Sequence, residues 1–224
     1  MVNSRASSPK PAARRTQAER RQHTRQALLD AALLQIEAGE SFDSLSLRSV
    51  AKAAGVVPTA FYRYFASMDE LGLALIEDSF RTLRGMLREA RDAEVPPARV
   101  VNHSVEILIG YVHENRQQFS FVARVRSTGN VVLRHAIRAE IRLFVSDLAA
   151  DLARFPILGT WATDDLQMLA GLLVNTMIAT IEAVLDAPSD SAAAQAEITQ
   201  LAANQMRLIL LGVPQWKGTR GPSR

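Results

Sequence analysis

Residues 47–65 read LRSVAKAAGVVPTAFYRYF, and this stretch joins two short helical patterns at a single glycine. Apolar side chains at helical spacing predict that the first pattern buries Leu47, Val50, Ala51 and Ala54. Ser46 can cap the start of this helix, and Gly55 is expected to end it. A third helix is expected to begin near Pro58, because proline is favoured at the first position of a helix. The small alanines and the tight turn together are typical of a helix-turn-helix.

The helix after Pro58 is expected to pack on one face and to present the other face to solvent. Its packing face holds Phe61 and Phe65, with Val57 and Tyr64 at the edge, and its outward face holds Thr59, Tyr62 and Arg63. In a DNA-binding helix-turn-helix this second helix enters the major groove, where guanidinium and hydroxyl groups can reach phosphates or base edges. The same pattern also fits a buried helical hairpin with an incidental polar edge.

The segment upstream is strongly basic, although the net charge of the whole chain is only +3. Residues 1–16 are rich in Ser, Pro, Ala and Arg, and we expect them to form a disordered basic arm. Basic arms beside a helix-turn-helix can lie in the minor groove or along phosphates, which favours DNA binding over the hairpin interpretation. Arg20, Arg21 and Arg25 border the first helix and are the strongest candidates, whereas a solvated tail remains the alternative for residues 5–15.

The rest of the chain also predicts helices. Gly39 is expected to end a first helix whose buried stripe is Leu29, Ala32, Leu33 and Ile36. Ser67 and Glu70 form a capping box for a fourth helix, with an apolar seam at Leu73, Ile76, Phe80, Leu83 and Leu87. Further helices are expected near 98–114, 117–126, 131–155, 164–186 and 192–211, the longest with a stripe at Leu133, Ile137, Ile141, Phe144, Leu148 and Leu152.

These patterns predict an all-α protein of about nine helices. A helix-turn-helix DNA-binding domain is expected at 17–66, a helical ligand-binding and dimerisation bundle at 67–215, and a flexible tail at 216–224. The apolar stretch at 166–185 is interrupted by polar residues such as Asn175 and Glu182, so we interpret it as a buried helix and expect no membrane partner. The chain has no cysteine and a polar start without a signal-peptide core, which favours a cytoplasmic location.

No catalytic motif is present in the sequence. There is no phosphate-binding glycine loop, no Gly-x-Ser-x-Gly elbow and no His-Glu-x-x-His zinc motif. His103 and Glu106 are the only pair at a spacing that suggests acid–base chemistry, and such pairs are usually surface hydrogen bonds. We therefore expect a protein that is not an enzyme, with no cofactor and no metal.

Residues 24–80, TRQALLDAALLQIEAGESFDSLSLRSVAKAAGVVPTAFYRYFASMDELGLALIEDSF, resemble the TetR family of bacterial transcriptional repressors. The resemblance implies a homodimer with one DNA-binding domain per subunit and a C-terminal ligand-sensing domain. It implies base contacts for Val57, Pro58, Thr59 and Ala60, and phosphate contacts for Tyr62 and Tyr64. Ser46 and Arg48, at the start of the second helix, complete the expected DNA contacts. Met68 stands where many members have a lysine that contacts phosphate.

Residues 44–75 look closest to the branch that represses unsaturated-fatty-acid synthesis or desaturation genes and senses long-chain acyl thioesters. Two later segments are similar to the same branch: QFSFVARVRSTGN at 118–130 and QMRLILLGVPQW at 205–216. The branch usually has an acidic residue where this chain has Val125. The resemblance thus implies an acyl-CoA or acyl-ACP ligand, without a role for that acidic side chain.

A long acyl chain requires an apolar tunnel, which facing helices of a bundle can leave open. The candidate lining residues are Phe80, Leu83, Leu87, Ile107, Tyr111, Phe119, Phe144 and Met177, with ordinary core packing as the alternative for each. Phosphates of a coenzyme A head would require cations, and Arg124 and Arg126 are the first choices. Arg134, Arg138 and Arg142 fit a solvated helix face better.

The last two expected helices are apolar around more of their circumference than a surface helix should be. Pairing them with their copies would make a four-helix dimer interface, and the alternative is a central position in a monomer. A two-fold dimer would favour a palindromic operator. Two other functions remain open: a repressor of efflux genes that senses drug-like hydrophobic compounds, and a helical lipid carrier or acyl-handling enzyme.

Overall fold

The computed structural model describes residues 16–92, 99–127, 129–188 and 191–218, and for 87–92 it describes the backbone alone. Within these ranges the chain has nine α-helices and no strand, as the sequence predicts. The helices are α1 (Gln17–Glu37), α2 (Leu47–Ala53), α3 (Pro58–Phe61), α4 (Met68–Asp92), α5 (Val100–Glu114), α6 (Arg116–Val125), α7 (Val131–Leu152), α8 (Thr163–Asp186) and α9 (Ala192–Gly212). Two short 3₁₀ helices, η1 (Phe42–Ser44) and η3 (Val213–Gln215), complete the regular structure.

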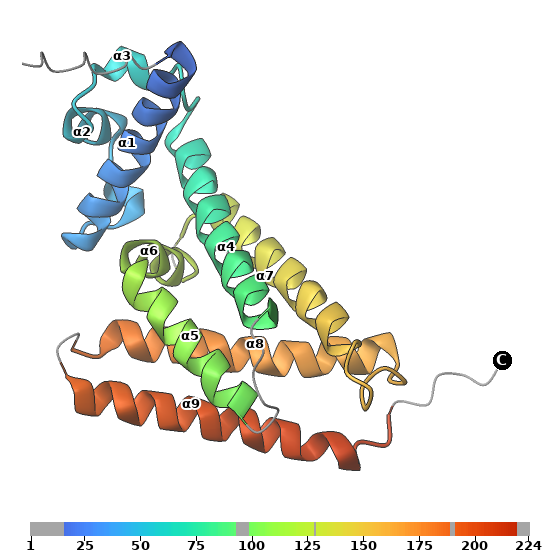
Figure 1. Ribbon diagram of the computed structural model, residues 1–224. Coiled ribbons are helices and arrows are strands. Elements are labelled where there is room, and N and C mark those ends of the chain that lie inside the picture. The colour runs from blue at the N-terminus through green and yellow to red at the C-terminus, as the bar shows by residue number, and fades with distance from the viewer. Residues whose placement is uncertain (1–15, 93–98, 128, 189–190, 219–224) are drawn as a thin grey trace, which may run out of the picture.

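Helices α1 to α3 form a small unit at one end of the molecule (Figure 1). The predicted stripe of α1 is buried, and Leu28 and Ala31 widen it. Both predicted glycine stops are confirmed, because Gly39 and Gly55 have φ of 105° and 70°, a region that favours glycine. At each stop two N–H groups bond back to the last carbonyls of the helix, which satisfies groups that a helix end leaves free.

Helix α4 leads from the small unit into the larger bundle and runs beside α7 (Figure 1). The hydroxyl of Ser67 accepts a 3.2 Å bond from the N–H of Glu70, as predicted, but the Glu70 carboxylate bonds the N–H of Ala66 rather than that of Ser67. The predicted seam is correct at Ile76 and Phe80, which are buried, and wrong at Leu73, which is 37% exposed. Helix α4 is covered by the small unit, α6 and α7, so its buried arc extends to Leu71 and Leu75 instead.

Helix α7 carries the predicted inward stripe. Leu133, Ile137, Phe144 and Leu152 are buried, and Ile141 and Leu148 are half-buried. The helix ends at Leu152, three residues before the predicted end, and a series of turns follows it. Together with α4 it forms one wall of the bundle, so these side chains fill the space between α4, α6 and α8.

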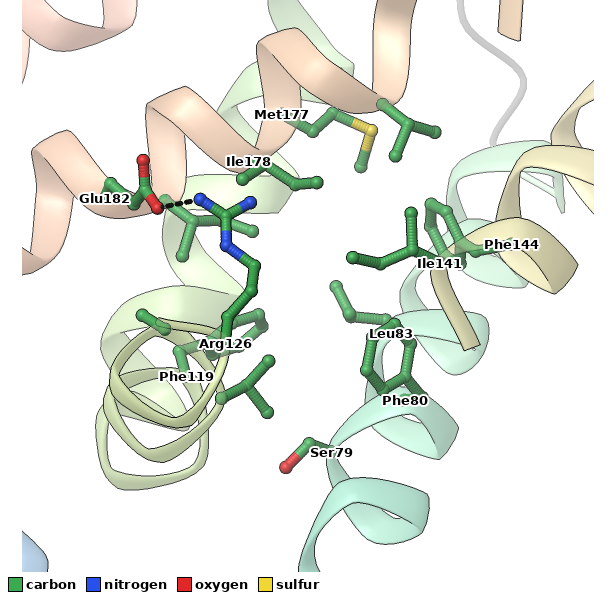
Figure 2. A pocket seen from close by; sticks show the side chains of 14 residues that line it. Ser79, Phe80, Leu83, Phe119, Arg126, Ile141, Phe144, Met177, Ile178 and Glu182 are labelled. Atoms are coloured by element: carbon green, nitrogen blue, oxygen red, sulfur yellow. Dashed lines mark hydrogen bonds and ion pairs between the residues drawn. The ribbon is translucent and has the colours of Figure 1, made fainter. Parts of the chain in front are cut away.

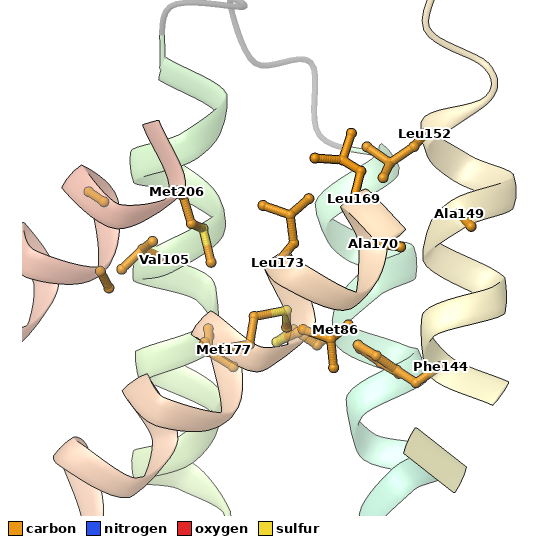
Figure 3. Close-up of a cluster of buried hydrophobic side chains, with 14 of the residues drawn as sticks. Met86, Val105, Phe144, Ala149, Leu152, Leu169, Ala170, Leu173, Met177 and Met206 are labelled. Atoms are coloured by element: carbon orange, nitrogen blue, oxygen red, sulfur yellow. The ribbon is translucent and has the colours of Figure 1, made fainter. Parts of the chain in front are cut away.

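Helices α8 and α9 lie side by side across the far end of the molecule, with α5 packed against both (Figure 1). With α4 and α7 they enclose a hydrophobic core cluster that includes Met86, Phe144, Leu173, Met177 and Met206 (Figure 3). By length and composition α8 could cross a membrane. In the described structure it packs against α5, α6, α7 and α9, which agrees with its interpretation as a core helix.

Candidate DNA-binding surface and ligand cavity

The turn between α2 and α3 is fixed by local hydrogen bonds. Ser46 caps α2, because its hydroxyl accepts a 3.1 Å bond from the N–H of Ser49, whose own hydroxyl accepts from the N–H of Ser46. At the other end the N–H of Gly55 donates to Lys52 O and the N–H of Val56 to Ala51 O, at 3.1 and 2.9 Å. These bonds set the direction in which the chain enters α3, so the sequence determines the relative placement of the two helices.

Helix α3 ends at Phe61, and the helix and the turn at 62–65 face the way the sequence predicts. Phe61 and Phe65 are 0% and 2% exposed, and their ring centroids lie 5.7 Å apart. Tyr62 is 63% exposed, and Thr59 and Arg63 are exposed as well. Helix α3 and the turn after it are anchored by two phenylalanines and direct two hydroxyls and a guanidinium outward, where phosphates and base edges could be reached.

The other predicted DNA contacts lie around this helix. Val57 is 65% exposed rather than at the packing edge, because it caps α3 from outside its first turn. Pro58 is exposed, Ala60 and Tyr64 are half-buried, and Ser46, Arg48, Arg20 and Arg21 are exposed. Arg25 lies 5.3 Å from the centroid of the Phe65 ring, so it links α1 to the segment that follows α3. The predicted arm at 1–16 lies outside the described residues except for Thr16, which caps α1. DNA contacts by these side chains stay predictions.

A cavity lies between α4, α6, α7 and α8. Its volume is about 70 Å³, and apolar side chains make up most of its wall. The lining residues are Ser79, Phe80 and Leu83 from α4; Phe119, Val122, Ala123 and Arg126 from α6 and its C-cap; Ile141 and Phe144 from α7; and Val174, Met177, Ile178, Ile181 and Glu182 from α8. The apolar wall suits a hydrophobic small molecule.

The polar side chains of the cavity are few. The Ser79 hydroxyl donates a 2.7 Å bond to Leu75 O within its own helix, so its donor is occupied. Arg126 and Glu182 form an ion pair in which Nη2 of the guanidinium donates to Oε1 of the carboxylate. Figure 2 shows this pair on one side of the cavity, opposite Phe80, Leu83, Ile141 and Phe144. The cavity is therefore an apolar space with one charged pair in its wall.

The structure brings six of the ten predicted ligand residues to this cavity: Phe80, Leu83, Phe119, Arg126, Phe144 and Met177. Ile107 and Tyr111 lie instead on α5, which contributes no lining residue, and they pack against the core around α8 and α9. Arg124 donates a 2.7 Å bond to Ile36 O at the end of α1 and points away from the cavity. The Leu87 side chain lies outside the described part of the structure. Arg134, Arg138 and Arg142 are also absent from the lining.

Sequence reasoning missed most of the α8 wall. Val174, Ile178, Ile181 and Glu182 line the cavity beside the predicted Met177. Glu182 could have been recognised from the sequence, because it is an acidic residue within the apolar stretch at 166–185. At the level of sequence it served only as evidence against a membrane span. A charged residue within an apolar helix also indicates a functional site when its partner comes from another helix.

Helix α6 contacts the cavity with one face and the small unit with the other. One face lines the cavity through Phe119, Val122 and Ala123. The other face contacts the small unit: Gln117 Nε2 donates to Glu37 Oε2 at 2.6 Å, and the Phe121 ring meets the Phe42 ring edge-on at 5.5 Å. With the bond from Arg124 to Ile36 O, these contacts attach α6 to the end of α1 and to η1. A displacement of α6 at the cavity would therefore displace the small unit, which includes α3.

An apolar stripe remains exposed on the outer face of α8 and α9. Met168 and Leu172 on α8 are 43% and 47% exposed, and Leu201, Leu208 and Leu211 on α9 are 58%, 71% and 72% exposed. Within each helix these residues recur at helical spacing, and the two helices are neighbours. Exposed apolar side chains gathered on neighbouring helices are typical of an interaction site.

Comparison with known protein families gives two matches that together span most of the chain. Residues 28–75 match the model of bacterial regulatory proteins of the tetR family, and residues 97–212 match the tetracyclin repressor-like C-terminal domain. The second match alone covers more than half of the chain.

The fold is similar to those of several solved bacterial regulators. The fatty acid degradation regulator FadR from Bacillus halodurans superposes with a TM-score of 0.67 at 17% identity, over 84% of this chain and 95% of its own. FadR from Bacillus subtilis in complex with stearoyl-CoA gives 0.63 at 14% identity, over 84% and 98%. GusR from Salmonella enterica gives 0.65 at 24% identity, over 84% and 95%. At these identities the likeness is one of fold.

Proposed function

The chain belongs to the TetR family of bacterial regulatory proteins, and from this premise we propose that it is a repressor whose binding to its operator responds to a long-chain acyl thioester. Membership makes it a DNA-binding transcriptional regulator rather than an enzyme. The regulated genes are then those of fatty-acid metabolism, as the resemblance of residues 44–75 implies. A cytoplasmic location agrees with this role.

The observation that carries the ligand class is the cavity between α4, α6, α7 and α8. Its wall is apolar, and one ion pair interrupts it. An acyl chain needs such a wall, and the FadR structure with stearoyl-CoA gives a protein of the same fold with an acyl ligand. Arg126 is the cation that could meet the polar end of the ligand.

DNA recognition is assigned to the exposed side of α3 and the residues around it. Thr59, Tyr62 and Arg63 are free to meet the major groove, and Arg20 and Arg21 lie on the exposed surface of α1. The apolar stripe on α8 and α9 supports a two-fold dimer with its copy, because leucines as exposed as Leu208 and Leu211 are costly in water. Such a dimer would place two α3 helices about 34–36 Å apart and favour a palindromic operator.

We propose that ligand and DNA are coupled through α6 and α4 together. Both helices line the cavity, α6 is bonded to the end of α1, and α4 continues directly from the small unit. A ligand can shift the spacing of the two α3 helices only by its difference in affinity for the two arrangements.

Titration of the protein into labelled fragments of its own upstream DNA, with and without palmitoyl-CoA and oleoyl-CoA, tests the proposal. We expect a salt-sensitive, site-specific complex whose dissociation constant changes when an acyl-CoA is present, and the titration gives the sign of the change. Absence of any site-specific complex would overturn the regulator assignment. A complex indifferent to acyl-CoA but released by hydrophobic cations would favour the efflux alternative.

A further inference from the structure

We propose that Glu182 makes the cavity discriminate against ligands that carry a free carboxylate, so that an acyl chain is accepted with its carbonyl in an uncharged linkage. The inference rests on the proposed acyl-sensing function and adds the residue that sets its head-group specificity. It follows from the position of one ion pair in an apolar wall.

Arg126 and Glu182 supply the charges in the cavity wall. The guanidinium has five N–H donors, and in the described structure its hydrogen bond to Glu182 uses one of them. The side chains are 34% and 43% exposed, so the pair lies where the cavity meets solvent rather than in the dry interior. A ligand whose chain fills the apolar space would bring its polar end to this pair.

A neutral carbonyl can bind to Arg126 while the ion pair with Glu182 stays formed. The oxygen of a thioester, ester or amide accepts a hydrogen bond from a free N–H of Arg126 while the bond to Glu182 remains intact. The two charges of the pair stay balanced, and no ionised group is left without a partner. The neutral head therefore binds without breaking the ion pair.

A free carboxylate meets a different situation. If the ligand carboxylate binds beside the ion pair, it lies close to the negatively charged Glu182 carboxylate, and the two like charges repel. Bound in place of Glu182, it must break the existing ion pair and leave the Glu182 carboxylate without its cation. Solvent at the rim screens both effects, so we expect discrimination of about tenfold rather than complete exclusion.

Two probes with the same chain separate the head groups from the phosphates of coenzyme A. Dodecanoate carries the free carboxylate, and S-dodecanoyl-N-acetylcysteamine carries a neutral thioester. Calorimetric titration of the full-length protein at pH 8 and low salt should show the thioester binding at least about tenfold more tightly. In Glu182→Gln, which keeps the side-chain size and can still accept from Arg126, dodecanoate should gain about tenfold, and the thioester should change less than about threefold.

Asp186→Asn is the matched control, because Asp186 lies one turn further along α8, is exposed and does not line the cavity. It removes the same charge from the same helix, and the ratio of the two affinities should stay at the wild-type value. Equal binding of the two probes to the wild type, or an unchanged ratio in Glu182→Gln, would overturn the inference. If neither probe nor palmitoyl-CoA binds the wild type, the proposed acyl-sensing function itself fails.

Discussion

Arg124 Nη1 on α6 donates a 2.7 Å hydrogen bond to the carbonyl oxygen of Ile36 in the last turn of α1. The same carbonyl accepts from the N–H of Gly39, whose left-handed conformation ends the helix. A guanidinium near the C-terminal end of a helix is favoured by the helix dipole. The bond thus joins the helix that lines the cavity to the helix that supports the DNA-binding unit.

Replacing Arg124 with Met should weaken the communication between ligand and operator. The change removes one bond to a charged group at an exposed side chain, so the free energy of unfolding should fall by only about 1 kcal/mol. The ratio of operator dissociation constants with and without acyl-CoA should move toward one, as measured by fluorescence anisotropy. Arg138→Met, an exposed arginine on α7 outside the cavity, should keep the wild-type ratio. A full response in Arg124→Met would contradict the coupling route.

Arg63 should be required for operator binding but not for folding. Loss of a direct bond from a charged group is worth about 1.5–3 kcal/mol, so Arg63→Ala should weaken operator binding by about tenfold or more. If the contact is to phosphate, the slope of log affinity against log salt should fall by about one per subunit. Tyr62→Phe should weaken binding less, since it removes a neutral donor. Normal affinity in both variants would mean that α3 meets DNA by another face; Arg138→Ala serves as the control.

The parts of this structure that the sequence predicted correctly are those that local chemistry determines. The Ser46 cap, the glycine stops and the outward position of Thr59 and Arg63 depend on residues within a few positions of one another. The cavity depends on which helices face each other across the bundle. Ile107 and Tyr111 have the same apolar periodicity as the true lining residues, but α5 packs on the core around α8 and α9. Periodicity identifies a buried face without identifying its neighbour.

Arg124 shows the same limit for a charged residue. It lies two positions before Arg126 in the sequence, and both were equal candidates for a ligand phosphate. Two residues correspond to more than half a turn of helix, so the two side chains leave α6 in different directions. Arg126 lines the cavity, whereas Arg124 reaches α1. The different roles of Arg124 and Arg126 follow from the position of α6 between the small unit and the helical bundle, which the sequence alone does not reveal.

Gly55→Ala should destabilise the helix-turn-helix through its backbone alone. The φ of Gly55 is 70°, and a Cβ added there would meet nothing within 4 Å, so no steric contact contributes. An L-residue in this conformation costs about 1–2 kcal/mol, which should appear as a lower midpoint in urea denaturation. Gly55→Asn should cost less, because asparagine tolerates the left-handed region. Equal stability of Gly55→Ala and the wild type would show that the turn opens to another conformation.

Two glycines on α4 should respond to alanine with opposite signs. A Cβ on Gly72 would lie 2.8 Å from Leu133 Cδ1 and 2.8 Å from Phe42 Cζ, and both side chains are buried. Overpacking of this kind costs about 1–3 kcal/mol. Gly85→Ala has no such neighbour, and alanine in a helix is favoured over glycine by about 1 kcal/mol. Urea denaturation should therefore show Gly72→Ala below the wild type and Gly85→Ala at or above it.

Leu208→Arg should separate the subunits of the proposed dimer. Leu208 is 71% exposed on α9, so in a monomer a charged replacement would cost little, whereas in a dimer it would place a cation in an apolar interface. Sedimentation should show the wild type as a dimer and Leu208→Arg as a monomer, with operator affinity reduced because two α3 helices no longer bind together. Leu143→Arg is the matched control, since Leu143 is 56% exposed and lies on α7 rather than on α8 or α9. It should remain dimeric and keep operator affinity. If both variants remained dimeric, the dimer interface would have to lie elsewhere; if both became monomeric, the interface would extend to α7.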